Sequence, residues 1–142
     1  MAKGFKQEQG VDFDEIFSPV VKMTTFCVML ALVAKNDLDL FQMDVKTAFL
    51  HGDLDKEIYM EQPNGYEVYR KMPLVCKLNK CLYRLKQSPR KCYKNFDTFM
   101  RSQSYAKSNE DSCLYMKKCI DDSYGIWILY VDDMLIMGKK QG

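Results

Sequence analysis

Three aspartates at the ends of short apolar segments are the side chains best suited to chemistry in this sequence. Asp132 and Asp133 interrupt the apolar run 125–137, and Asp44 closes an alternating segment at 38–44. Carboxylate oxygens are the ligands that hard divalent cations such as Mg²⁺ prefer. If neighbouring strands bring these aspartates together, they could hold a pair of metal ions that stabilises an in-line phosphoryl transfer.

The Asp132–Asp133 pair also has a structural interpretation, a tight hairpin turn exposed to water, because aspartate tolerates turn geometry. Such turns more often carry Asn-Gly or Asp-Gly, so the functional interpretation is favoured. Zinc chemistry is not indicated, since His51 is the one histidine and the six cysteines contain no C-x-x-C pair. We expect six reduced thiols, as in cytosolic or nuclear proteins.

Basic residues are concentrated in one third of the chain. Ten Lys or Arg residues and a single acid, Asp97, fall within 70–101, so the net charge of +2 divides into +9 there and −7 elsewhere. Aromatic residues are interleaved with these bases, namely Tyr69, Tyr83, Tyr93 and Phe96. This pattern suits a polyanion such as nucleic acid. A solvated helix face with the aromatic side chains in the core is equally compatible with it.

We expect one domain over residues 1–142, because this length can bury a core and no repeat or linker divides the chain. Apolar periodicity predicts a buried helix at 26–35, capped by Thr24 or Thr25, and a helix from Ser88 to about 102 with Pro89 in its first turn. Short strands are predicted at 38–44, 57–60, 74–78, 113–116, 126–131 and 134–137, with a turn at 121–125. The apolar run around the two aspartates is too short to cross a bilayer, so no membrane contact is expected.

The strand 126–131 is apolar on both alternating faces. It should therefore be a central strand with cover on both sides.

Five blocks make the sequence similar to the reverse transcriptases of copia-type LTR retrotransposons. Residues 130–133 match the Y-x-D-D box of these polymerases. The other blocks follow in the family's order and spacing: DFDEIFSPVV at 12–21, QMDVKTAFLHG at 42–52, EIYMEQP at 57–63 and LYRLKQSP at 82–89. The resemblance covers essentially the whole chain. It implies an α+β fold in which helices pack on one face of an antiparallel sheet. The chain would be an incomplete right-hand fingers and palm region of the polymerase, without thumb or RNase H.

The resemblance also implies catalytic and metal-binding roles. Asp44 resembles the first catalytic aspartate, and Asp132 and Asp133 resemble the second pair. Asp44 and Asp132 would hold two Mg²⁺ ions, with Asp133 an accessory ligand, while a primer 3′-hydroxyl attacks the α-phosphate of a deoxynucleoside triphosphate.

Further residues would bind the substrates. The nucleotide would contact Val45, Phe49, Gln87 and Tyr130. Phe49 would lie against the sugar and exclude the 2′-hydroxyl of ribonucleotides, although a core phenylalanine is the alternative. Template and primer backbones would contact Lys86, Arg90, Lys91 and Lys94.

These roles imply that the chain is an RNA-directed DNA polymerase segment of a Pol polyprotein, and thus a nucleotidyltransferase. The resemblance places it in a cytoplasmic virus-like particle or in the nucleus. Its partners would be an RNA template, a DNA primer, deoxynucleoside triphosphates and the rest of the polyprotein. One alternative is a truncated, catalytically inactive remnant that at most binds nucleic acid, through its basic segment 70–101. A metal-dependent nuclease that uses the same carboxylates is a less favoured alternative.

Three residues depart from the family pattern. Arg84 stands where glycine is usual, Cys92 where tryptophan is usual, and Cys27 where arginine is usual. If the glycine serves a positive φ angle or a close approach of the backbone to nucleic acid, an arginine there strains or obstructs the site.

Overall fold

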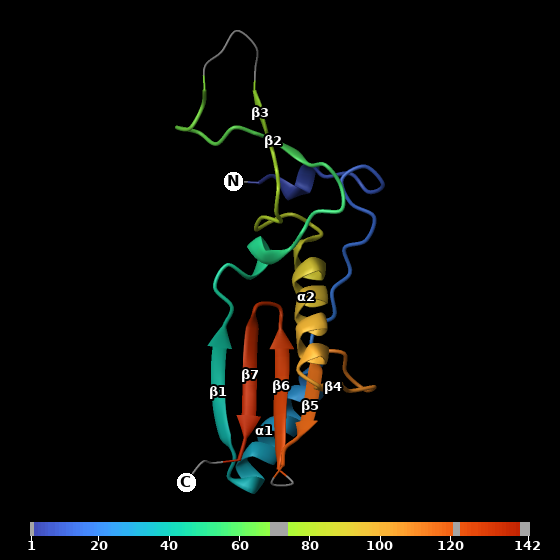
Figure 1. The fold of residues 1–142 in the computed structure, drawn as a ribbon, viewed down its shortest axis with the longest axis vertical. Coiled ribbons are helices and arrows are strands. Elements are labelled where there is room, and N and C mark those ends of the chain that lie inside the picture. Colours follow the sequence, from blue (N-terminus) through green and yellow to red (C-terminus); the bar gives the residue numbers. More distant parts are fainter. Residues whose placement is uncertain (1, 69–73, 121–122, 140–142) are drawn as a thin grey trace. The chain divides into compact units, whose positions relative to one another are not determined.

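The computed structural model describes residues 2–68, 74–120 and 123–139 (Figure 1). The chain divides into two compact units. Unit 1 consists of Met1–Phe17 and Thr47–Cys92, and unit 2 consists of Ser18–Lys46 and Tyr93–Gly142. Each unit combines two separate stretches of sequence, so no linker composition marks the division. Several residues used in the sequence analysis lie outside the described residues, namely Tyr69, Arg70, Lys71, Asp121 and Asp122.

Unit 2 is built on a five-stranded antiparallel sheet with the order β1-β7-β6-β5-β4 (Figure 1). Its strands are β1 (Asp39–Asp44), β4 (Ala106–Lys107), β5 (Leu114–Lys118), β6 (Tyr124–Tyr130) and β7 (Asp133–Gly138). The four longer strands confirm the predicted segments to within two residues. β4 was not predicted, because two residues carry no periodicity.

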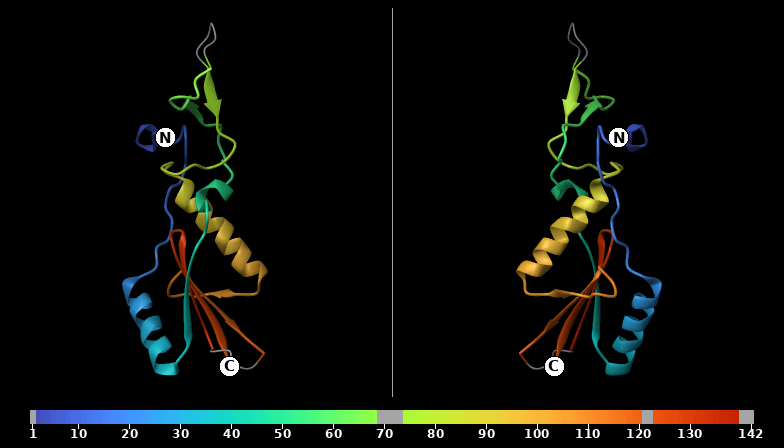
Figure 2. Two further views of the ribbon diagram at one scale, coloured as in Figure 1. Left: turned by 90° about the vertical axis from the view of Figure 1, so that its left-hand side faces the viewer. Right: turned by 90° about the vertical axis from the view of Figure 1, so that its right-hand side faces the viewer.

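Two helices cover opposite faces of this sheet, as Figure 2 shows: α1 (Met23–Asn36) and the part of α2 (Ser88–Ser102) that belongs to unit 2. Met29 and Val33 of α1 pack against a cluster of Leu114, Ile126, Ile128 and Met137. Tyr93 and Phe96 of α2 pack against a second cluster, Cys113, Leu129 and Met134. The expectation that the helices pack on one face is therefore wrong. The central strands are apolar on both faces, and each face requires cover.

Helix α1 is less buried than its apolar sequence predicts, since none of its residues is fully buried. It begins at Met23, and its N terminus is held by a distant carboxylate and not by the predicted threonine cap. The buried Asp111 accepts hydrogen bonds from the backbone N–H groups of Lys22 and Cys113, both at 2.9 Å. This contact joins the start of α1 to the connection between β4 and β5.

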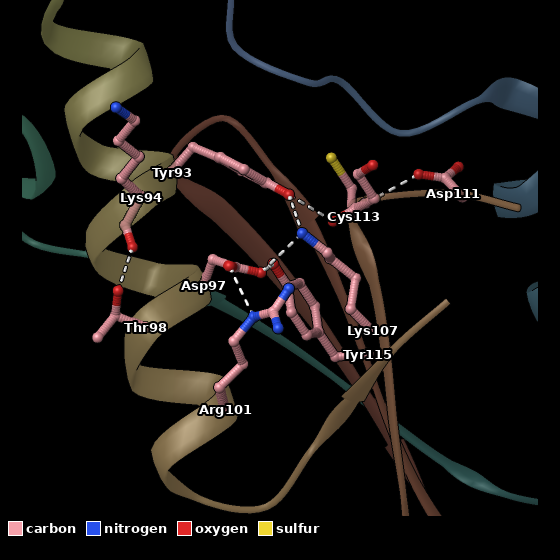
Figure 3. Close-up of polar contacts among 10 residues, drawn as sticks. Tyr93, Lys94, Asp97, Thr98, Arg101, Lys107, Asp111, Cys113 and Tyr115 are labelled. Carbon is pink, nitrogen blue, oxygen red and sulfur yellow. Dashed lines mark hydrogen bonds and ion pairs between the residues drawn. The ribbon is translucent and has the colours of Figure 1, made fainter. Parts of the chain in front are cut away.

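A second carboxylate, Asp97, fastens α2 to strands β4 and β5 (Figure 3). It accepts hydrogen bonds from the Tyr115 hydroxyl and Arg101 Nε, both at 2.8 Å, and pairs with Lys107 Nζ at 3.1 Å. Burial alone would raise the pKa of Asp97, but the hydrogen bonds from Tyr115, Lys107 and Arg101 together lower it. The helix is thus held by a charge network as well as by apolar packing.

Unit 1 contains little regular structure. It has the short helices η1 (Gly4–Lys6) and η2 (Ala48–His51), the first turn of α2, and a two-stranded antiparallel sheet of β2 (Tyr59–Glu61) and β3 (Val75–Lys77). Strand β3 confirms the predicted strand 74–78 in shortened form, whereas β2 overlaps the predicted strand 57–60 but is shifted to 59–61. Helix α2 begins at Ser88 as predicted, and the Ser88 hydroxyl donates to the Leu82 carbonyl oxygen at 2.7 Å.

All six cysteines lie among the described residues, and each is a free thiol. Cys81 and Cys113 are buried, and burial raises the pKa of the Cys113 thiol to about 12. Burial raises the pKa of the Cys81 thiol as well, so both thiols remain protonated near neutral pH, which suits a packing role. In the described part of the chain, no helix has the length and apolar character needed to span a membrane.

Candidate active site

The predicted catalytic aspartates gather where the β6–β7 hairpin turns. β1 pairs with β7 so that Asp44 lies opposite Asp133, and Tyr130 of β6 also pairs with Asp133. Val131 and Asp132 are therefore the two residues of the turn. The predicted hairpin and the neighbouring strand that ends at Asp44 are confirmed, with the correction that Asp133 begins β7.

The sheet register fixes how these carboxylates face. Residues directly opposite each other in an antiparallel pair share a face, with Cβ atoms about 4.5–5.5 Å apart, so Asp44 and Asp133 lie side by side. Their face is the one that α1 covers further along the strands, toward the end away from the turn (Figure 1). Asp44 is exposed, whereas Asp132 and Asp133 are partly buried. The pair is accessible to a substrate.

A backbone hydrogen bond and a strained residue set the position of the turn. The Val45 N–H donates to the Asp132 carbonyl oxygen at 3.2 Å, which joins the end of β1 to the turn. Val131 has φ of 60°, and of the two turn residues it alone has a positive φ, the pattern of a type II′ turn. Glycine is usual at that position, and a β-branched residue there costs about 1–3 kcal/mol. Apolar alternation does not reveal the sign of φ, so this strain was not predicted.

The expected metal site is not assembled in the structure. Among the described residues, no three His, Cys, Asp or Glu side chains form a group that could hold a metal ion. Asp44 and Asp133 share a face through the register, but Asp132 lies in the turn, and three carboxylates repel one another. The chemistry of the three side chains nevertheless fits a hard divalent cation, because all offer carboxylate oxygens.

The structure divides the predicted nucleotide-binding residues between the units. Val45 and Tyr130 lie beside the aspartates in unit 2, and Tyr130 is 54% exposed. Phe49 belongs to η2 of unit 1, where it is buried with its ring edge-on to Tyr83 at a centroid distance of 4.7 Å. This packing agrees with the core alternative for Phe49, and its contact with a sugar stays a prediction.

Gln87 is also engaged within unit 1. It is buried, its side-chain oxygen accepts a hydrogen bond from Gln7 Nε2 at 3.1 Å, and its amide nitrogen donates to the Asp12 carbonyl oxygen at 3.4 Å. The side chain therefore holds the N-terminal segment of unit 1 against the start of α2. Its contact with a nucleotide is untested.

Most described bases of the segment 70–101 are paired with acids. The ion pairs are Lys77–Glu57, Lys80–Asp53, Arg90–Glu15, Lys91–Asp55 and Arg101–Asp97. Four of these acids come from other parts of the sequence, so they offset four of the nine net positive charges of this segment.

The four predicted nucleic-acid contacts are therefore not equivalent. Arg90 and Lys91 are the ion-paired ones. Lys86 Nζ donates to the Gln7 carbonyl oxygen at 3.0 Å and lies 5.2 Å from the centroid of the Phe13 ring. Lys94 is exposed, and its ammonium group points away from the Asp97 network (Figure 3).

Arg84 occupies the left-handed backbone conformation that the glycine of the family pattern would suit. Its φ is 75°, and a Cβ built on Gly4 would lie 1.7 Å from the Arg84 carbonyl oxygen. Of the two reasons considered for a glycine here, the structure bears out the positive φ, and a close approach to nucleic acid stays a prediction. The Arg84 backbone also lies close to Gly4 within unit 1. Cys27 is exposed on α1 and Cys92 is half-buried on α2, and nothing in the structure explains these two departures.

Comparison with known proteins agrees with the resemblance. The family described as "Reverse transcriptase (RNA-dependent DNA polymerase)" matches residues 1–142. The chain is 59% identical over 142 residues to the retrovirus-related Pol polyprotein from transposon TNT 1-94 of Nicotiana tabacum, which covers all of this chain and 11% of that protein. It is 37% identical over 139 residues to the Pol polyprotein from transposon RE2 of Arabidopsis thaliana, 98% of this chain and 10% of that protein. The chain thus spans about a tenth of the length of these relatives. No solved structure matches it.

Proposed function

Because the chain belongs to the reverse transcriptase (RNA-dependent DNA polymerase) family, we propose that it carries the catalytic carboxylates of an RNA-directed DNA polymerase within a Pol polyprotein. The observation that carries this proposal is the register that sets Asp44 opposite Asp133, beside the turn that contains Asp132. Asp44 and Asp133 lie on adjacent strands and are therefore held more firmly than carboxylates on loops, and the turn residue Asp132 is joined to the end of β1 by the hydrogen bond from the Val45 N–H.

In the proposed reaction, the 3′-hydroxyl of a primer attacks the α-phosphate of a deoxynucleoside triphosphate, and pyrophosphate leaves. Asp44 and Asp132 would hold two Mg²⁺ ions, with Asp133 as an accessory ligand. When bound, the ions would stabilise charge on the attacking and leaving oxygens. Val45 would offer its backbone, and Tyr130 its exposed ring, to the bound substrates.

The other substrate contacts belong to the same proposal. Phe49 and Gln87 would select and position the nucleotide, and the RNA template and DNA primer would lie along Lys86, Arg90, Lys91 and Lys94. Arg90 and Lys91 would exchange their carboxylate partners for phosphates. Lys86 and Lys94 have no carboxylate partner to exchange among the described residues.

Primer extension on an RNA template tests the proposal, using a chimera in which residues 1–142 replace the matching segment of the tobacco polyprotein. We expect Mg²⁺-dependent synthesis, reduced roughly 10³-fold by Asp44→Asn or Asp132→Asn through lost charge stabilisation. Asp39→Asn is the matched control, because Asp39 is the same residue type at the other end of β1. Equal activity of Asp132→Asn and the unsubstituted chimera would contradict the proposed metal site.

The second candidate function is an inactive remnant that only binds nucleic acid through residues 70–101. It is less favoured, because Asp44, Asp132 and Asp133 are all retained and five of the described bases in that segment are ion-paired. An inactive chimera, beside an active tobacco polymerase, would support the remnant and contradict the main proposal.

A further inference from the structure

Helix α1 leaves one apolar side uncovered. Its inner side packs on the sheet through Met29 and Val33. Its outer side carries Val28, 54% exposed, and Leu32, 37% exposed, and within the described part of unit 2 no other element lies over it (Figure 2). A helix that is apolar on all sides is normally buried, so this outer side is expected to face a partner. The same side also exposes Thr24, Cys27, Ala31 and Lys35.

The exposed residues have the spacing of a helix that can pair with a copy of itself. Thr24, Val28, Ala31 and Lys35 follow one another at steps of four, three and four residues, so they form one stripe along α1. Val28 and Ala31 lie at equal distances from the midpoint of the helix, and so do Thr24 and Lys35. A two-fold axis through this midpoint would therefore set Val28 of one copy against Ala31 of the other.

The middle of the outer side is small and uncharged. Cys27 and Leu32 are also equally distant from the helix midpoint, so each thiol would flank the leucine of the other copy. An arginine at position 27, which is usual in the family pattern, would place one charge from each copy in this apolar contact, where a charge without a partner is costly. With cysteine there, the outer side carries no charge between Thr24 and Lys35.

The two ends of α1 carry opposite charges that an antiparallel pair would bring together. Lys35 lies in the last turn of the helix. Glu110 lies beside the first turn, because its carbonyl oxygen accepts a hydrogen bond from Lys22 Nζ at 2.7 Å. Both side chains are exposed, and neither forms an ion pair with another described residue. Each Lys35 would therefore approach Glu110 of the other copy, whereas a parallel pair would bring like charges together.

We propose that the outer side of α1 is a homodimer interface, at which two copies of this chain pair antiparallel about an axis between Val28 and Ala31. The interface is small, because one side of a 14-residue helix supplies less than the roughly 800 Å² per partner of a standard stable interface. The expected dissociation constant is therefore about 10–100 µM. This inference does not depend on the proposed polymerase activity, since the three aspartates take no part in it.

Sedimentation equilibrium of the 142-residue chain tests the interface, in a reducing buffer that prevents disulfide-linked dimers. The chain should be a monomer at about 1 µM and mainly a dimer at about 500 µM. Cys27→Arg should weaken self-association at least about tenfold, and it should leave the fold intact because this side chain is exposed. Cys119→Arg is the matched control, since it adds the same charge at the other exposed cysteine, outside α1, and should leave the dissociation constant unchanged.

A charge exchange tests the antiparallel arrangement. Lys35→Glu and Glu110→Lys should each weaken the dimer about threefold to tenfold, because like charges then face each other across the interface. The double variant should recover the parent affinity, which a loss of folding in either single variant could not produce. The proposal is overturned by a monomer over the whole concentration range, by a dimer that Cys27→Arg leaves intact, by equal weakening in Cys119→Arg, or by a double variant that does not recover.

Discussion

The two units of this chain are stabilised in different ways. Unit 2 has a five-stranded sheet, an apolar cluster on each face, and two carboxylates, Asp97 and Asp111, that fasten its helices to the sheet. Unit 1 has two strands of three residues and exposed ion pairs. A packed sheet opens rarely, whereas loops tied by surface contacts open locally at lower cost.

This difference matches the chemistry that each unit carries. The aspartates need fixed spacing, and strand register supplies it by setting Asp44 opposite Asp133. Contacts to a flexible polyanion tolerate variation, and unit 1, which holds Lys86, Arg90 and Lys91 of the proposed template and primer contacts, contains little regular structure. Rigid elements thus carry the proposed catalytic groups, and adaptable segments carry the proposed binding surface.

The largest expected change in the free energy of unfolding comes from truncating one buried isoleucine in each unit. Ile128, 1% exposed in β6, and Ile58, 4% exposed in unit 1, are both truncated to alanine. Ile128→Ala should lower the free energy of unfolding by about 3 kcal/mol, and Ile58→Ala by about 2 kcal/mol, because loops collapse more readily around a cavity. Urea unfolding with amide hydrogen exchange measures both. Loss of protection in both units from either substitution would show that they unfold together.

A somewhat smaller effect is expected at the buried carboxylate of unit 2. Asp111→Ala leaves the backbone N–H groups of Lys22 and Cys113 without their acceptor, which should lower the free energy of unfolding by about 2 kcal/mol. The neighbouring Glu110→Ala is the control, expected within about 0.5 kcal/mol of the parent. Chemical denaturation followed by circular dichroism measures both. Similar costs for the two variants would remove Asp111 from its structural role.

Elements with a local cause could be predicted from the sequence, and elements that depend on distant partners could not. Helix α2 begins at Ser88 because serine and proline together favour a helix start, and the hairpin follows from apolar runs on both sides of two aspartates. The N terminus of α1 depends on Asp111, 89 residues beyond Lys22. No local pattern contains such a partner.

The same limit applies to the candidate site. The neighbourhood of Asp44 and the hairpin could be predicted, because strand ends and a recognisable motif mark both. The partial cancellation of the positive charge of segment 70–101 could not be predicted, since Arg90 pairs with Glu15 and Lys91 with Asp55 across long stretches of sequence. The positive φ of Val131 depends on the turn geometry that the paired strands impose.

Lowering the pH should destabilise unit 2 more than unit 1, by less than the substitutions described above. Burial alone would raise the pKa of Asp111, but hydrogen bonds from the Lys22 and Cys113 backbone and from Thr25 lower it overall, and the pKa of Asp97 is lowered as well. The folded state then binds fewer protons than the unfolded state, so this stability is fully present above the ordinary carboxyl pKa of about 4 and is lost as pH falls below it.

Urea midpoints at about pH 7 and pH 3 measure this effect. Asp97→Asn and Asp111→Asn should each flatten the pH dependence of unit 2. Glu57 of unit 1 also has a lowered pKa, because Lys77 and Tyr59 donate hydrogen bonds to it, but it is fully exposed and solvent screens its contribution. Glu57→Gln should therefore leave the pH dependence unchanged, and an equal flattening would contradict this assignment.

The smallest expected change in stability concerns the strained residues, one in each unit. Val131→Gly and Arg84→Gly should each raise the free energy of unfolding by about 1 kcal/mol, because glycine adopts these positive φ angles, 60° and 75°, without a Cβ clash. The greater conformational freedom of glycine in the unfolded state limits this gain in stability. Thermal melts measure both. The increase in stability should be larger for Val131→Gly, since a β-branched side chain is least tolerated at a positive φ.

Their functional effects should differ. Val131→Gly frees the turn that holds Asp132, so primer extension by the chimera should fall even as stability rises. Arg84→Gly leaves the aspartates and their register untouched and should leave primer extension by the chimera unchanged. If Val131→Gly instead lowered stability, valine would fit the turn without strain. If it left primer extension unchanged, the hydrogen bond from Val45 and the β1–β7 register would be sufficient to position Asp132.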